Sequence, residues 1–345
     1  MIVRGWHFAF DTGEDAALAT LYYPGDDRRI GEARLTGQVP ALEAEAPWPV
    51  VIMMPGINVA PDGYRWLAHR LVADGLCLIT YAIIGSLGPA GQGITPGIDL
   101  SALTPDTIGT RPSSTALGPL LAHLAPLAHP APAAGNTPVT GMLDLDRVVV
   151  GGHSAGGTVA LHNSDPEWVP GLRAVFTYAA HTMTAVDLGH GEGAVLAVPA
   201  KVPILLTGGT GDGVIAASRD RYRTSDNPTG NNPTSDNAAG NNPTGDDGGA
   251  HDPIHRTFKE AIGRRRGDSW LVELKGTGHF AICWPVDTTS GRSYLEPDPV
   301  NAEPATRELL GNLISCFIAA SLGRGSVSQM EQLVEHPAVN RWDRC

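Results

Sequence analysis

The feature that most constrains this chain is the stretch VVVGGHSAGGTVAL, which runs from Val148 to Leu161. An apolar run ends at two glycines, Ser154 follows a histidine, and two more glycines precede a second apolar run. Glycines on both sides remove the side chains that would collide in a sharp turn between a strand and a helix. The stretch therefore predicts a buried strand, a turn that presents the Ser154 hydroxyl above a sheet edge, and a helix.

Short apolar runs with helical patterns between them continue along the chain. Continuous β-branched runs suit strands that are buried on both faces, and strands that alternate with helices suit parallel sheets. We therefore expect an α/β fold: one domain over residues 1–345, with a mostly parallel central sheet, helices on both faces and an antiparallel strand pair at the amino terminus. The expected strands are residues 50–54, 76–81, 147–150, 174–178, 202–206 and 270–274.

Helical spacing of apolar residues predicts helices near residues 64–72, 117–124 and 309–317, the first ending at Gly75. Two segments break this rhythm. Residues 85–114 are rich in glycine and proline and too long for an ordinary connection, so we expect a lid or an active-site loop. Residues 224–249 contain a ten-residue repeat, TSDNPTGNNP and TSDNAAGNNP, with no core-forming side chain. This low-complexity insertion is expected to be disordered and dispensable.

A serine hydroxyl becomes a strong nucleophile only when a neighbouring base takes its proton, and a third group must orient that base. Downstream of Ser154, Asp212 follows the run VPILLTGGTG, and His279 follows WLVELKGTG. Both would lie on glycine-rich turns at the carboxyl ends of strands, where open α/β sheets place their active sites. The sequence therefore predicts a catalytic triad of Ser154, Asp212 and His279.

Simpler roles stay open for these residues. Ser154 could be a helix N-cap, Asp212 a turn former and His279 a structural histidine. Asp187 is the alternative acid, although it lies further beyond its strand. His153 is expected to point away from the nucleophile and to support the turn.

Acyl transfer also needs donors for the developing oxyanion. The expected donors are the backbone N–H of Ala155, directly after the serine, and that of Ile57, in the loop after the strand at 50–54. For Ile57 the alternative is an ordinary strand-to-helix turn. The side chains expected to line the substrate pocket are Asn58, His181, Phe280 and Trp284, with apolar support from Ile57, Val59, Ile94, Ile98, Leu100, Leu103 and Ile282.

Composition excludes several classes of function. The chain has 24 basic and 36 acidic residues, a formal net charge of -12, and no basic stripe with interleaved aromatics, so we expect no nucleic-acid partner. No apolar run reaches the length of a membrane span, and the amino terminus has no signal-peptide pattern. We expect a cytoplasmic protein whose four scattered cysteines are reduced thiols.

A metal site is the weaker alternative. His251 and His255 have the i, i+4 spacing of a zinc-binding pair, but Pro253 lies between them and no third ligand is evident. The aspartates and asparagines of the repeat lack the spacing of a calcium loop. The expectation is therefore an enzyme without a metal.

Three stretches, MMPGINVAPDGYRWLAHRLVADGLCLITY, GGHSAGG and GTGHFAI, resemble the α/β-hydrolase superfamily, and within it the dienelactone hydrolases, chlorophyllases and cutinase-like polyester hydrolases. The resemblance covers roughly residues 50–322. It implies a serine esterase without metal or organic cofactor, with Ser154, Asp212 and His279 as nucleophile, acid and base. Three departures limit it. Serine stands where dienelactone hydrolases usually have cysteine, Pro55-Gly56 stands where many members have His-Gly, and the repeat has no counterpart.

The expected function is hydrolysis of a carboxylic ester of a small-molecule substrate through an acyl-enzyme on Ser154. No lysine or arginine lies in the stretches expected to form the pocket, so we expect an uncharged or apolar substrate. Two alternatives remain: a thioesterase, lactone-forming acyltransferase or peptidase that uses the same triad, and a non-catalytic binding protein on a hydrolase fold. The sequence specifies neither the natural ester nor the oligomeric state.

Overall fold

The computed structural model describes the chain except residues 14, 35, 88–90, 130–136, 185, 222–252, 264–265, 288, 290–291 and 296–303. The expectations for the repeat at 224–249 and for His251 lie outside the described residues.

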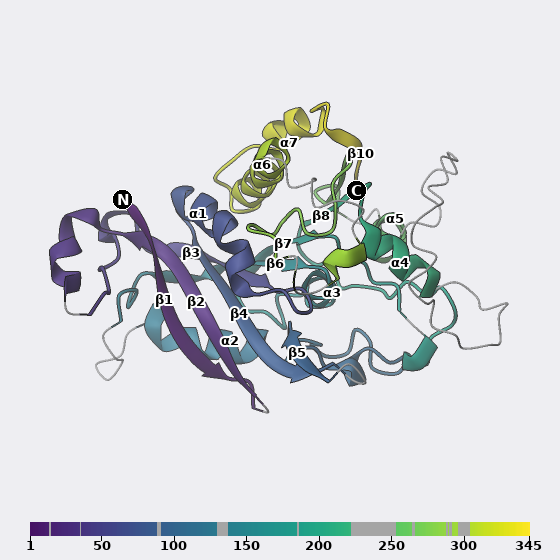
Figure 1. The fold of residues 1–345 in the computed structure, drawn as a ribbon, viewed down its shortest axis with the longest axis horizontal. Helices are drawn as coiled ribbons and strands as arrows, with labels where there is room; N and C mark the ends of the chain where they lie inside the picture. Colours follow the sequence, from purple (N-terminus) through teal and green to yellow (C-terminus); the bar gives the residue numbers. More distant parts are fainter. Residues whose placement is uncertain are drawn as a thin grey trace.

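A ten-stranded sheet runs through the molecule in the order β1-β2-β4-β3-β6-β7-β8-β9-β10, and β5 pairs with β4 (Figure 1). The six strands from β4 to β9 in this order are parallel to one another. The strands β1, β2, β5 and β10 add to this group in antiparallel pairs. The bounds are β1 (Ile2–Asp11), β2 (Ala16–Gly25), β3 (Trp48–Met54), β4 (Cys77–Ser86), β5 (Gln92–Thr95), β6 (Leu143–His153), β7 (Leu172–Tyr178), β8 (Ile204–Gly209), β9 (Trp270–Leu274) and β10 (Val339–Arg344).

Helices cover both faces of this sheet. The strand β3 illustrates why its sequence is apolar throughout, because Val50 and Ile52 pack into the core on one face while Val51 and Met53 pack into the core on the other. Residues of α2 to α5 contribute to the first core, and residues of α1, α6 and α7 contribute to the second. The bounds are α1 (Arg65–Ala73), α2 (Leu117–Ala128), α3 (Ala155–His162), α4 (Gly213–Arg221), α5 (Pro253–Arg256), α6 (Pro304–Ser321) and α7 (Val327–Val334).

These elements confirm the predicted mostly parallel sheet, the surrounding helices and the amino-terminal antiparallel pair. The helix α1 ends as expected at Gly75, which adopts a φ of +77° while the N–H of Leu76 donates to the carbonyl of Leu71. Strand boundaries differ from the prediction: β3, β4, β6 and β7 are longer than predicted, and the strand predicted at 202–206 begins at Ile204. Pro203 precedes it and has no N–H to donate to a ladder.

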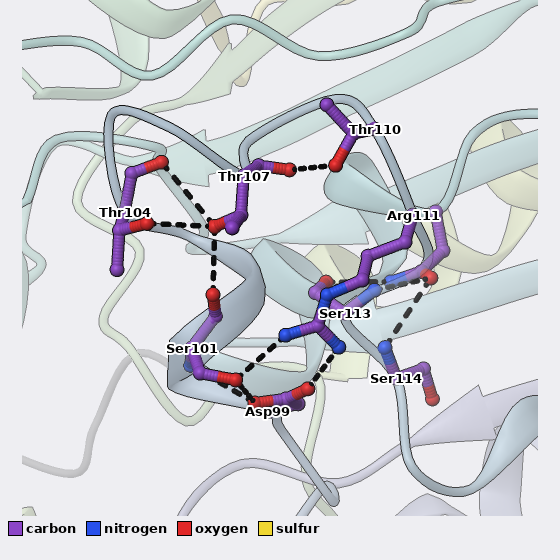
Figure 2. A network of polar contacts seen from close by, with 9 residues as sticks. Asp99, Ser101, Thr104, Thr107, Thr110, Arg111, Ser113 and Ser114 are labelled. Atoms are coloured by element: carbon purple, nitrogen blue, oxygen red, sulfur yellow. Dashed lines mark hydrogen bonds and ion pairs between the residues drawn. The ribbon is translucent and has the colours of Figure 1, made fainter.

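Within the segment 85–114, hydrogen bonds hold residues 99–114 in a loop that we call the braced loop (Figure 2). Asp99 accepts hydrogen bonds from the backbone and the hydroxyl of Ser101, and the guanidinium of Arg111 binds both of these side chains. The buried side chain of Asn163, at the end of α3, accepts from the N–H groups of Ser113 and Ser114 at 3.1 and 3.3 Å. The loop is therefore fastened to the helix that follows Ser154.

Candidate active site

The predicted catalytic residues lie together at the carboxyl ends of the strands, because each of them follows a parallel strand. Ser154 comes directly after β6, Asp212 lies three residues beyond the end of β8, and His279 lies five residues beyond the end of β9. The loop that contains Ile57 follows β3, the neighbour of β6. The carboxyl ends of parallel strands form the usual position of a site in such sheets.

Ser154 occupies a strained turn between β6 and α3. Its φ is +53° and its ψ is -125°, a conformation that residues with a side chain rarely adopt. The backbone holds it there: its N–H donates to the carbonyl of Tyr178 at 3.0 Å, and its carbonyl accepts from the N–H of Thr158 at 3.0 Å. The Ser154 side chain caps no backbone group of α3, so the alternative of a simple N-cap does not describe its geometry.

The glycines around Ser154 are required by close backbone packing. A Cβ atom on Gly152 would lie 2.4 Å from the carbonyl oxygen of Gly156. A Cβ atom on Gly156 would lie 2.4 Å from the carbonyl oxygen of Met54, in β3. Contacts this short with backbone atoms exclude any side chain. The sequence pattern thus corresponds to a turn in which the start of α3 is pressed against β3 and β6.

His279 and Asp212 form a buried pair. The Nδ1 atom of His279 lies 2.9 and 3.0 Å from the two carboxylate oxygens of Asp212, and both side chains are about 3% exposed. Asp212 also accepts a hydrogen bond from the N–H of Ile215 at 2.7 Å, so it caps α4 as well. The carboxylate is therefore fixed from two sides, and it fixes the imidazole in turn.

The two turns that carry this pair are joined by backbone hydrogen bonds. The N–H of Thr210 donates to the carbonyl of Leu274, and the N–H of Gly211 donates to the carbonyl of Thr277. The Thr210 hydroxyl accepts from the N–H of Gly276 at 2.8 Å. Both predicted turns are rich in glycine because the two segments pass each other too closely for side chains. A Cβ atom on Gly209, for example, would lie against the Thr277 carbonyl.

A cavity of about 220 Å³ opens where these residues meet. Ser154 and His279 both line it, and so do the predicted oxyanion donors Ile57 and Ala155. The remaining lining residues are Val59, Ile98, His153, Thr158, Ala179, Ala180, His181, Met183, Val214, Ile215, Ser218, Phe280 and Arg292. The structure thus places the predicted nucleophile, the predicted base and both predicted donors around one cavity.

Two of the four predicted pocket residues lie in this lining and two do not. His181 and Phe280 line the cavity. Asn58 instead binds β5, since its side chain accepts from the N–H of Ile94 at 3.0 Å and its own N–H donates to the carbonyl of Ile94. Trp284 is 47% exposed and stacks against the guanidinium of Arg307, 3.9 Å from the ring centroid. Neither Asn58 nor Trp284 lines this cavity.

The apolar support predicted from residues 85–114 comes from one side chain. Ile98 lines the cavity, whereas Ile94, Leu100 and Leu103 do not. Leu103 is buried, and Leu100 is exposed. Ile282 belongs to the core between the sheet and α6 rather than to the cavity. Helical periodicity was not available in this segment to show which side chains point inward.

Sequence reasoning also missed residues. Met183, Val214 and Ile215 line the cavity from segments after β7 and β8. Arg292 lines it as well, although it lies outside every stretch that was expected to form the pocket. Asp187, the alternative acid, is an exposed residue on a short 3-10 helix, Val186–Leu188, and is absent from the cavity lining.

Within the described part of the chain, no three His, Cys, Asp or Glu side chains are grouped to hold a metal ion. His255 is buried and lies 3.6 Å from a carboxylate oxygen of Glu273. The four cysteines, Cys77, Cys283, Cys316 and Cys345, are free thiols. No helix among the described residues combines the length and the apolar character needed to cross a membrane.

Compared with models of known protein families and with curated proteins, the chain matches none.

Proposed function

We propose that this chain is a serine hydrolase of the α/β-hydrolase fold that cleaves a carboxylic ester through an acyl-enzyme on Ser154. One observation carries the proposal: the cavity that holds the strained Ser154 turn also holds His279, and the Nδ1 atom of His279 is bound by the buried carboxylate of Asp212. Strain of this kind at a cavity is typical of functional residues. The combination matches the roles of nucleophile, base and orienting acid.

The proposed reaction starts from the hydrogen bond between His279 and Asp212. A carboxylate only accepts, so the proton of the neutral imidazole is on Nδ1 of His279 and Nε2 is the basic nitrogen. Nε2 takes the Ser154 proton as Oγ attacks the ester carbonyl carbon, and the N–H groups of Ile57 and Ala155 stabilise the oxyanion. The protonated imidazole then gives its proton to the leaving alcohol. Water repeats the sequence on the acyl-enzyme and releases the acid.

The cavity lining favours an apolar acyl group. Ile98, Met183 and Ile215 supply apolar surface around it. Arg292 is the single lysine or arginine among the described lining residues. An ester that bears a carboxylate could pair with Arg292, so it is the substrate to compare with uncharged esters.

The test is a panel of esters with short, medium and aromatic acyl groups, together with a matched ester that bears a carboxylate. The proposal expects kcat/KM to be highest for an uncharged medium-chain or aromatic ester. A preference for the carboxylate would transfer the assignment to an Arg292-directed substrate of the dienelactone type. Faster turnover of thioesters or amides would identify a thioesterase or a peptidase, and transfer to an added alcohol an acyltransferase. A folded protein that neither turns over nor reacts with a fluorophosphonate would be a binding protein.

A further inference from the structure

His153, the last residue of β6, contacts both halves of the proposed machinery although it takes no part in the proton transfers. Its side chain is fully buried directly before Ser154. Its Nε2 atom lies 3.0 Å from the backbone carbonyl oxygen of His279, and its Nδ1 atom lies 3.0 Å from the hydroxyl of Tyr64. The same hydroxyl lies 3.0 Å from the backbone nitrogen of Gly56, the residue before Ile57.

The directions of these three hydrogen bonds are fixed by chemistry. A carbonyl oxygen only accepts, so Nε2 of His153 carries the ring proton and donates to His279. Nδ1 is then an acceptor and takes the proton of the Tyr64 hydroxyl. The Tyr64 oxygen in turn accepts from the N–H of Gly56. A single chain of donors thus runs from the loop after β3, through Tyr64 and His153, to the backbone of His279.

The environment keeps both side chains in the neutral forms that this chain requires. Burial, followed by the neighbouring His279, holds the pKa of His153 well below its usual range. Burial raises the pKa of Tyr64 well above its usual range. The thiol of Cys283 lies further away, 3.8 Å from Nδ1 of His153, and burial raises its pKa to about 12, so it adds no charge.

Packing supports the same connection independently of the hydrogen bonds. A Cβ atom on Gly56 would lie 2.9 Å from Nδ1 and 3.3 Å from Cε1 of His153. The imidazole therefore lies directly against the backbone that leads into Ile57, and glycine at position 56 makes this contact possible. On the other side, Tyr178 donates its hydroxyl proton to the carbonyl of Gly278 at 2.6 Å, which gives the His279 turn a second attachment.

We propose that His153 and Tyr64 are positioning residues that hold the oxyanion donor Ile57 and the base His279 at fixed places around Ser154. This inference rests on the proposed hydrolase function. Neither residue touches the reacting atoms in this role. Their effect is to set the relative positions of two groups that must act on the same carbonyl, and small displacements of such groups slow catalysis strongly.

The first test is Tyr64→Phe, which removes only the hydroxyl, compared with Tyr23→Phe. Tyr23, in β2, is also buried and donates to the carbonyl of Val39 at 2.6 Å, and neither of these residues lines the cavity. We expect kcat and the rate of fluorophosphonate labelling to fall by about 10-fold or more in Tyr64→Phe, with KM changed by less than about twofold. Tyr23→Phe should keep the wild-type kcat even where it lowers the melting temperature.

A second pair keeps the test decisive. His153→Gln retains an N–H that can reach the His279 carbonyl, whereas His153→Leu does not, and we expect Gln to label at least about 10-fold faster than Leu at a temperature where both are folded. Equal rates within both pairs would overturn the inference while leaving the proposed function intact. Wild-type protein that does not label would contradict the proposed function itself, and the inference with it.

Discussion

Both carboxylate oxygens of Asp212 lie within 3.0 Å of Nδ1 of His279, in a pair that is almost fully buried. This relationship assigns the proton of the neutral imidazole to Nδ1, and in the proposed mechanism Nε2 is then the base. It also distinguishes Asp212 from Asp187, which is exposed on a surface helix.

Replacing Asp212 with Asn should therefore disable the base without unfolding the protein. Asparagine is also a good helix N-cap, so the cap on α4 is retained. Its amide N–H₂ would force Nδ1 to accept, and kcat should fall by about 10⁴-fold with KM nearly unchanged. Steady-state kinetics of Asp212→Asn and of Asp187→Asn, which should match wild type, provide the comparison. Wild-type kcat in Asp212→Asn would remove it from the site.

Because α3 lies so close to β3, adding a single methyl group at position 156 should lower the free energy of unfolding. In Gly156→Ala the new Cβ would meet the carbonyl oxygens of Met54 and Pro55 at 2.4 and 2.5 Å. Backbone atoms cannot move aside as a flexible side chain can, so we expect a loss of about 3 kcal/mol of unfolding free energy. Gly118→Ala is the control, because nothing lies within 4 Å of its added Cβ on the exposed side of α2. Urea titration should find this control at least as stable as wild type.

The hydrogen bonds of Asn163 predict that this side chain stabilises the attachment of the braced loop to α3. Its side chain accepts from two backbone N–H groups, of Ser113 and Ser114, and donates to the Ser113 hydroxyl and the Val159 carbonyl. Asn163→Ala leaves buried donors without partners, which should cost about 2 kcal/mol. Because Ile98 pairs with Ser114 and lines the cavity, KM should also rise. Arg111→Ala, which breaks an exposed ion pair with Asp99, should cost less than about 1 kcal/mol. If Asn163→Ala and Arg111→Ala lowered the free energy of unfolding equally, Asn163 would not be the main attachment of the braced loop.

His162 predicts an acid limit on stability. Burial lowers its pKa from 6.5 to about 4 in the folded protein. Between these values the unfolded chain binds a proton that the folded protein does not, so the contribution is present at neutral pH and is lost as the pH falls from about 6.5 towards 4. The loss amounts to roughly 3 kcal/mol, and His153 acts in the same direction. In urea titrations at pH 7 and pH 4.5, His162→Gln should lose less stability than wild type. His69→Gln, on the exposed side of α1, should lose as much as wild type. If His162→Gln and wild type lost the same free energy of unfolding between pH 7 and pH 4.5, the assignment to His162 would be contradicted.

The sequence predicted the parts of the fold that local chemistry specifies. Apolar runs located the parallel strands because both faces of each strand are buried, as in β3. The GGHSAGG stretch predicted the turn at Ser154 because only a close approach of backbones requires glycines at that spacing. The strand β10 was not predicted. Its sequence, VNRWDR, is largely polar, and it becomes a strand through antiparallel pairing with β9, where Trp342 packs on Trp270.

The site was predicted less completely for a related reason. Ser154, Asp212 and His279 could be found because each follows a strand, but nothing local shows which side chains of an irregular segment face a cavity. Arg292 follows no strand directly, and the ring of Trp284 packs against the guanidinium of Arg307. The chain through Tyr64 and His153 joins residues 89 positions apart and becomes visible only in three dimensions.

The central claim is that Ser154 is the nucleophile, and covalent labelling tests it most directly. Wild-type protein treated with a fluorophosphonate should gain one adduct, and peptide mass mapping should locate it on Ser154. Ser154→Ala should not label and should lose nearly all esterase activity, while Ser164→Ala, a nearby buried serine that donates to the Leu161 carbonyl, should label as wild type does. An adduct on another residue, or a Ser154→Ala protein that labels at the wild-type rate, would contradict the account.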